Sequence, residues 1–180
     1  MKTNTKYIAS AIALSGVMAV STFGAAFAET VPVKFTTEAT SVDVTISDSI
    51  DIHAPAGSNV ADSVSDLSVK NNLTAAPIYV KGMVVSAHSG SGYTIQNYTN
   101  AATFAGYGAD SKNFGIALNE KGGTALGSVV DLKTGYTGSD TVAASQTLTY
   151  GFESLVSVSS GAVSGVQIGD CVVTISLNND

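Results

Sequence analysis

The chain offers only two imidazole side chains that could act as catalytic bases or metal ligands, and they lie far apart in the sequence. Its two histidines, His53 and His88, occupy different segments, and neither is followed by a second His or Cys at metal-ligand spacing. The Gly-x-Ser-x-Gly motif of serine hydrolases is absent, although a Ser/His/Asp triad can also assemble from distant positions. We predict no catalytic, cofactor-binding or metal-binding residue, two solvated histidines, and a protein that is not an enzyme.

An acidic band surrounds the turn at 55–57 and consists of Asp48, Asp51, Asp62 and Asp66. Carboxylate oxygens are the ligands that Ca²⁺ prefers, but the Asp-x-Asp-x-Asp-Gly pattern of calcium loops does not occur. Aspartate is also common at strand ends and turns, where its side chain accepts hydrogen bonds from nearby backbone. Turn residues are the favoured interpretation, and calcium binding stays open.

Tyrosines are the more suggestive class of residue. Tyr93, Tyr98 and Tyr107 lie in a segment rich in Gly, Ser, Thr and Asn. A tyrosine ring offers a flat apolar face and a polar hydroxyl, which suits contacts with sugars or proteins. These three residues are the candidate binding surface, and packing in a core or along an edge strand is the more common role for such side chains.

Cys171 is the only cysteine, so no intramolecular disulfide can stabilise the fold. In the segment 171–177 it shares a face with Val173, Ile175 and Leu177. We therefore predict a buried and unreactive thiol.

These residues must be positioned by β-strands, because apolar and polar residues alternate along much of the chain. In 41–47, Val42, Val44 and Ile46 face one side and polar residues face the other. Further strands are expected at 31–35, 78–87, 93–96, 114–118, 147–152 and 171–177, with weaker candidates at 49–53 and 67–69. Turn-forming residues are found at 55–59, 89–92, 121–123 and 134–139, and a long loop is expected between Thr99 and Lys112.

Many short strands separated by turns, without a sustained helical period, indicate an all-β protein. We predict a single antiparallel β-sandwich of the Ig-like or Greek-key type, with about seven to nine strands.

Residues 1–28 have the pattern of a secretory signal peptide. Two lysines supply positive charge, an apolar run follows over 7–20, and Ala26 and Ala28 are the small residues before a cleavage site. The apolar run is shorter than the roughly 20 residues that span a bilayer. We predict a signal helix cleaved after Ala28, one β-sandwich domain comprising residues 29–180, and a secreted protein without a membrane span after cleavage.

The mature chain is acidic and contains few charges. Its 152 residues include six lysines, no arginine and 14 acidic residues, a net charge of −8. Nucleic acids and anionic membrane surfaces both attract clustered positive charge. Neither is an expected partner.

Four segments carry a resemblance: Val42-Asp43-Val44-Thr45-Ile46, Ala56-Gly57-Ser58-Asn59-Val60, Val69 through Val80, and Asp170 through Leu177. Together they cover under half of the mature chain, which resembles secreted Gram-positive surface proteins of the WxL-like type. The Trp-x-Leu motifs of that family are absent because the chain has no Trp, and Ile175-Ser176-Leu177 stands in place of the second motif. The resemblance implies a β-sandwich at the bacterial surface, held non-covalently to the peptidoglycan wall. We expect peptidoglycan or other surface proteins as partners.

These observations favour one function and leave two alternatives. We expect an exported protein of the cell surface or cell wall, structural or adhesive and non-enzymatic. The first alternative is a self-assembling pilus or biofilm-matrix subunit, in which Val31–Phe35 pairs with the edge of another molecule. The second is a secreted carbohydrate-binding module or glycan-processing enzyme that uses tyrosine and aspartate side chains.

Overall fold

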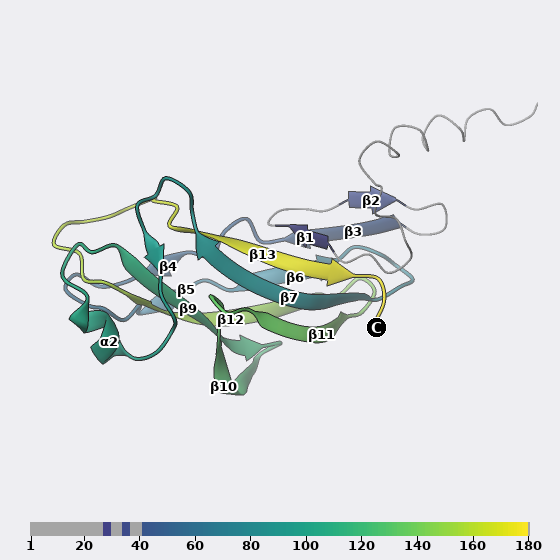
Figure 1. Ribbon diagram of the computed structural model, residues 1–180. Helices are drawn as coiled ribbons and strands as arrows, with labels where there is room; N and C mark the ends of the chain where they lie inside the picture. Colours follow the sequence, from purple (N-terminus) through teal and green to yellow (C-terminus); the bar gives the residue numbers. More distant parts are fainter. Residues whose placement is uncertain (1–26, 30–33, 37–40, 180) are drawn as a thin grey trace, which may run out of the picture.

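The computed structural model describes residues 27–29, 34–36 and 41–179, and these residues form an all-β sandwich of antiparallel sheets (Figure 1). The predicted signal helix and residues 31–33 of the predicted strand 31–35 lie outside the described residues. No helix in the described part of the chain is long and apolar enough to cross a membrane.

One sheet has four strands in the order β1-β13-β7-β11. The other has the order β10-β9-β12-β6-β3-β2, with β8 paired to β9, and β4 and β5 form a separate pair. The bounds are β1 Phe27–Glu29, β2 Lys34–Thr36, β3 Ser41–Ile46, β4 Ile52–His53, β5 Ser63–Val64, β6 Leu67–Asn71, β7 Ile78–Ala87, β8 Thr94–Ile95, α2 Ala101–Gly106, β9 Asn113–Lys121, β10 Thr124–Asp131, β11 Tyr136–Val142, β12 Thr147–Val156 and β13 Gly169–Ser176.

The core lies between the two sheets. Apolar side chains from β7 and β13 of one sheet pack with side chains from β3, β6, β9 and β12 of the other. Most long strands are followed by a strand of the opposite sheet, as in Greek-key sandwiches. Because consecutive strands lie in different layers, their buried faces can be covered only when both sheets are present.

A bulge in β7 keeps its apolar residues on the core face. The alternation that buries Ile78 and Val80 slips by one residue, so that Met83 and Val85 are buried next. At the same place the pairing with β13 passes directly from Val80 to Gly82. One extra residue on a bulged strand reverses the faces of the residues that follow it.

The predicted sandwich class is confirmed, but the number of strands exceeds the prediction. The described residues contain thirteen strands, of which eight are five residues or longer, and the others are short pairings of two or three residues. One pairing, β8 with β9, is parallel. The expected strand at 78–87 coincides with β7, and the expected loop between Thr99 and Lys112 contains the six-residue helix α2.

The turn predicted at 134–139 is wrong in its second half. β11 begins at Tyr136 and pairs with β7 as far as Val142. Its Gly, Ser, Thr and Asp residues have the composition of a turn, but the free edge of β7 supplies hydrogen-bond partners that override this local preference. The exposed strand β10, which projects from the sandwich, was likewise not predicted (Figure 1).

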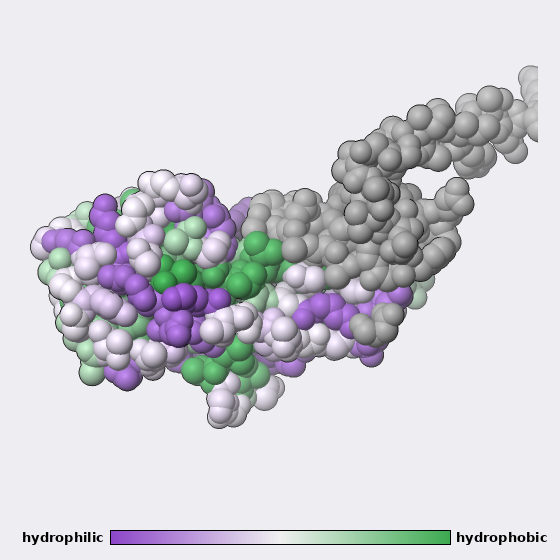
Figure 2. All heavy atoms as spheres, viewed as in Figure 1, coloured by the Kyte–Doolittle hydropathy of each residue, from purple (hydrophilic) through white to green (hydrophobic). Residues whose placement is uncertain are grey.

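The visible face of the described residues mixes hydrophilic, intermediate and hydrophobic areas (Figure 2). An apolar area lies over β10 in this view, where Val129 is 45% exposed. α2 lies at the end of the sandwich opposite to the C-terminal end of β13 (Figure 1). The loops around α2 and β8 bring together residues that lie far apart in the sequence.

Candidate functional site

Tyr93 is brought beside Lys112 by the parallel pairing of β8 with β9. Thr94 aligns with Asn113, so the residues just before them in each segment are neighbours. The backbone N–H of Thr94 donates to the carbonyl oxygen of Lys112 at 2.8 Å. Gly92 has a φ of 73°, which favours glycine, and the Lys112 side chain lies beside it.

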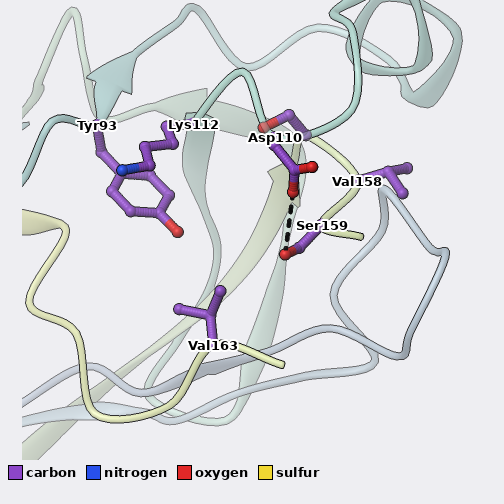
Figure 3. A pocket seen from close by; sticks show the side chains of 7 residues that line it. Tyr93, Asp110, Lys112, Val158, Ser159 and Val163 are labelled. Atoms are coloured by element: carbon purple, nitrogen blue, oxygen red, sulfur yellow. Dashed lines mark hydrogen bonds between the residues drawn. The ribbon is translucent and has the colours of Figure 1, made fainter. Parts of the chain in front are cut away.

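These residues border a shallow depression of about 70 Å³, which we call the Tyr93 hollow (Figure 3). It is lined by Tyr93, Asp110, Lys112, Ser157, Val158, Ser159 and Val163. Figure 3 shows the Tyr93 ring and Lys112 on one side, with Asp110 and Ser159 on the other. The hollow is small and open to solvent, so it suits a substituent or an edge of a ligand rather than the enclosure of a whole sugar ring.

Asp110 supplies a fixed carboxylate to the Tyr93 hollow. Its Oδ1 accepts hydrogen bonds from the backbone N–H of Ser160 at 2.8 Å and from the Ser159 hydroxyl at 3.4 Å, and its Oδ2 accepts from the Ser160 hydroxyl. The hydroxyl of Ser160, followed by its N–H, lowers the pKa of Asp110 below the ordinary 3.8. At neutral pH the hollow therefore presents a carboxylate, a lysine side chain and an aromatic ring.

Asn113, only 8% exposed, holds the segments that form the hollow. Its backbone N–H donates to Oγ of Ser157 at 3.0 Å, and its carbonyl accepts from the N–H of Ser157 at 2.8 Å. Its side chain donates to Oγ of Ser111 at 3.0 Å and accepts from Nε2 of Gln96 at 2.8 Å. No sequence motif marks Asn113, Asp110 or Lys112, because their roles arise from segments that meet only in the folded chain.

The three predicted tyrosines have different surroundings. Tyr93 lines the hollow. Burial, with a hydrogen bond to Glu153, raises the pKa of Tyr98, and the ring of Tyr107 meets Phe104 edge-on with centroids 5.4 Å apart. No ring contact between described residues joins any two of the three tyrosines. A binding surface shared by all three stays a prediction, and Tyr93 is its strongest member.

Each histidine is paired with an aspartate, which the sequence did not indicate. Nδ1 of His53 lies 2.6 Å from Oδ1 of Asp62, and Nδ1 of His88 lies 3.0 Å from Oδ1 of Asp170. The side chain of His53 is 71% exposed and that of His88 is 38% exposed. The expected solvation therefore holds fully for His53 and only in part for His88.

The acidic band is dispersed over several local contacts. Asp62 pairs with His53, and the backbone N–H of Asp51 donates to Oγ of Ser65 at 2.7 Å. Across the residues described by the structure, no group of three or more His, Cys, Asp or Glu side chains is arranged to hold a metal ion. The Asp62 carboxylate also accepts hydrogen bonds from its own backbone N–H and from that of Ser63, so Asp62 is seen in the turn-stabilising role that the sequence favoured.

A buried polar network joins the two sheets, and its centre is Asp140 of β11. Oδ1 of Asp140 lies 2.7 Å from Nζ of Lys121 in β9, and Oδ2 accepts hydrogen bonds from the hydroxyls of Tyr136 at 2.6 Å and Tyr150 at 3.0 Å. The Asp140 side chain is 8% exposed, whereas that of Lys121 is 38% exposed. Burial is the main cause of the raised pKa of both tyrosines, and the Asp140 carboxylate adds to it. Both hydroxyls therefore remain protonated donors at neutral pH.

Gly138 makes this network possible. Tyr136, Gly138 and Asp140 are alternate residues of β11. A Cβ at Gly138 would lie 2.2 Å from the Tyr136 hydroxyl oxygen, so the tyrosine side chain crosses the space that any other residue would fill. The Gly138-Ser139-Asp140 sequence, which has the composition of a turn, is therefore part of a strand. The Tyr136 side chain passes over Gly138 to donate its hydrogen bond to Asp140.

Cys171 packs against the core as a half-buried residue of β13. Burial raises the pKa of its thiol to about 12. The thiol is therefore protonated at neutral pH, which agrees with the predicted lack of reactivity.

Comparison with models of protein families, with curated proteins and with solved structures found no match.

Proposed function

We propose that the chain is an exported protein of the bacterial cell surface, non-enzymatic and structural or adhesive, which contacts glycan of the cell wall through the Tyr93 hollow. The observation that carries this proposal is the grouping of an aromatic ring, an anchored carboxylate and a lysine at the loop end of a β-sandwich. The signal pattern and the resemblance to WxL-like surface proteins support the location.

The groups of the hollow suit a weak, multivalent contact with sugar. The Tyr93 ring can stack on the apolar face of a pyranose. The Asp110 carboxylate, held by Ser159 and Ser160, can accept from sugar hydroxyls, and Lys112 can donate to hydroxyl or carboxylate oxygens. Because the hollow holds only part of a sugar, retention at the wall would depend on many molecules binding a repetitive polymer.

Sedimentation with purified bacterial sacculi tests this function. Residues 29–180 should pellet with sacculi and stay in solution without them. Tyr93→Ala should lower the pelleted fraction several-fold. Tyr79→Ala is the matched control, because Tyr79 is a half-buried tyrosine near the opposite end of β7 and should have no effect. Equal pelleting of both variants, or no pelleting of the parent protein, would reject a wall contact through the hollow.

A further inference from the structure

The predicted cleavage point lies inside a β-strand. β1 pairs antiparallel with β13, and its register places Phe27 opposite Ile175 and Glu29 opposite Val173. Cleavage after Ala28 removes two of the three residues of β1. The other side of β13 is already paired with β7. Signal removal therefore leaves one side of β13 without the strand that covers it in the uncleaved chain.

The edge uncovered in this way is suited to strand pairing. Val173 and Ile175 point into the core, and the segment from Cys171 to Ser176 contains no charge and no proline. Charges, prolines and bulges are the features with which proteins protect edge strands. To cover both core-facing residues with apolar surface, an incoming strand would need one apolar residue opposite Val173 and another opposite Ile175. β1 meets this condition only at Ile175, because it places Glu29 opposite Val173.

The same molecule cannot easily refill this edge. To cover Ile175, the chain would have to slide by two residues, so that Glu29 replaces Phe27 and Val31 faces Val173. Only three Cα–Cα steps would then remain from Val31 to Lys34, the first residue of β2 in the opposite sheet. Three steps of about 3.8 Å reach about 11 Å, hardly more than the roughly 10 Å between packed sheets.

We infer that residues 29–33 of a second copy occupy the edge of β13 once the signal has been removed. This inference rests on the proposed export. The segment Val31-Pro32-Val33 has the required apolar residue on each side of a central position. Pro32 is compatible with the role, because the incoming strand is itself an edge strand. Lys34–Thr36 can stay paired with β3 of the donor, so the donor gives up none of that pairing.

The contact joins residues 29–33 of one molecule to the edge of β13 in another. These two surfaces are different, and each molecule has one of each. Successive exchanges therefore build a chain of molecules, and a reciprocal exchange closes a dimer. Both forms are absent before cleavage, since β1 occupies the edge. Assembly would thus be coupled to export.

A register-specific disulfide tests the inference. In a Cys171→Ser background, mature protein with Pro32→Cys is mixed with mature protein with Thr174→Cys and oxidised mildly. Pro32 faces Thr174 in the proposed pairing, so a mixed disulfide dimer should form at least ten-fold more than with Thr141→Cys. Thr141 is the matched control, an exposed threonine on β11 at the other edge of the same sheet. An equal yield with both partners would overturn the inference.

The uncleaved chain provides the second arm. Thr174→Cys in the full 180-residue protein should lose the mixed dimer, because β1 covers the edge. An undiminished yield would also overturn the inference. N-terminal sequencing of protein secreted by a Gram-positive host separates this failure from failure of the proposed function. If secreted chains begin at Glu29 but form no mixed dimer, the proposed export stands and the strand exchange is rejected. If the chain is retained inside the cell, the proposed export is rejected.

Discussion

At the scale of single residues, the Asp140 carboxylate is the side chain that depends most on its hydrogen-bond partners. It is nearly buried and depends on Lys121, Tyr136 and Tyr150 for its hydrogen bonds. Breaking a buried ion pair by removing one partner destabilises more than removing both, because the remaining charge stays uncompensated. The half-exposed position of Lys121 moderates this cost.

Lys121→Met should therefore lower the free energy of unfolding by about 2 kcal/mol. Lys121→Met combined with Asp140→Asn should recover part of the loss, because an amide tolerates the missing cation. Urea denaturation of the two single variants and the double variant gives the coupling energy. Lys70→Met, at an exposed position of β6, is the control and should change stability little. A loss as large as that of Lys121→Met would contradict the assignment.

The Cys171 thiol should react slowly in the folded protein. Its pKa of about 12 leaves very little thiolate at pH 8, and the residue packs against the core. We expect Ellman's reagent to label it at least ten-fold more slowly under native conditions than in denaturant. Equal rates would show that β13 opens readily or that the thiol is exposed.

The ionised Asp62 carboxylate should stabilise the folded protein at neutral pH and lose this effect in acid. Its hydrogen bond from His53 lowers its pKa below the ordinary 3.8. A carboxyl group whose pKa is lowered by folding stabilises the fold above its unfolded pKa, and this contribution is lost as the pH falls through the folded value. Thermal unfolding between pH 6 and pH 2.5 should thus show a smaller acid-induced drop in Tm for Asp62→Asn than for the parent. Asp48→Asn, at another exposed aspartate, is the comparison and should follow the parent.

At the scale of elements, α2 depends on one buried ring. A helix of six residues is not stable alone in water, and α2 is held by its Asn100 N-cap and by Phe104, which is fully buried. Gly115 of β9 admits this ring, because a Cβ there would lie 2.8 Å from Cζ of Phe104. The position of Tyr107 follows from the same contact.

Gly115→Ala should displace Phe104 and release α2 from the sandwich. We expect faster amide hydrogen exchange over residues 100–107 with little change in β7 or β13. Phe104→Ala should produce the same local effect and lower stability by about 3 kcal/mol. Gly127→Ala in β10 is the matched control, since no atom lies within 4 Å of a Cβ at that position. Unchanged exchange in Gly115→Ala would show that α2 does not depend on this contact.

At the scale of the whole molecule, one hydrophobic cluster draws side chains from both sheets. Neither sheet can bury its apolar face without the other, so the mature chain should unfold in a single cooperative step. Far-UV circular dichroism and tyrosine fluorescence, the latter usable because the chain has no Trp, should give coincident denaturation curves. Two separate transitions would indicate two independent units.

The fold class and the inner faces of several strands can be predicted from the amino-acid sequence. Val42, Val44 and Ile46 alternate regularly with polar residues, the apolar run at 78–87 has the length and composition of a strand, and the structure confirms both strands. The hydrophobic effect acts on each residue in proportion to its apolar area. The side of a strand that will be buried can therefore be predicted from the order of apolar and polar residues. The inert character predicted for Cys171 came from the same source.

The polar arrangements, in contrast, depend on contacts between segments that are distant in the sequence. β11 became a strand because an edge of β7 was free, and Gly138 then allowed Tyr136 to reach Asp140. Asp110, Lys112 and Tyr93 form a hollow only because β8 pairs with β9 and the loop at 157–163 closes over them. Hydrogen bonds and ion pairs require particular atoms within about 3 Å of each other, and residues far apart in the sequence satisfy that condition only after the sheets have packed.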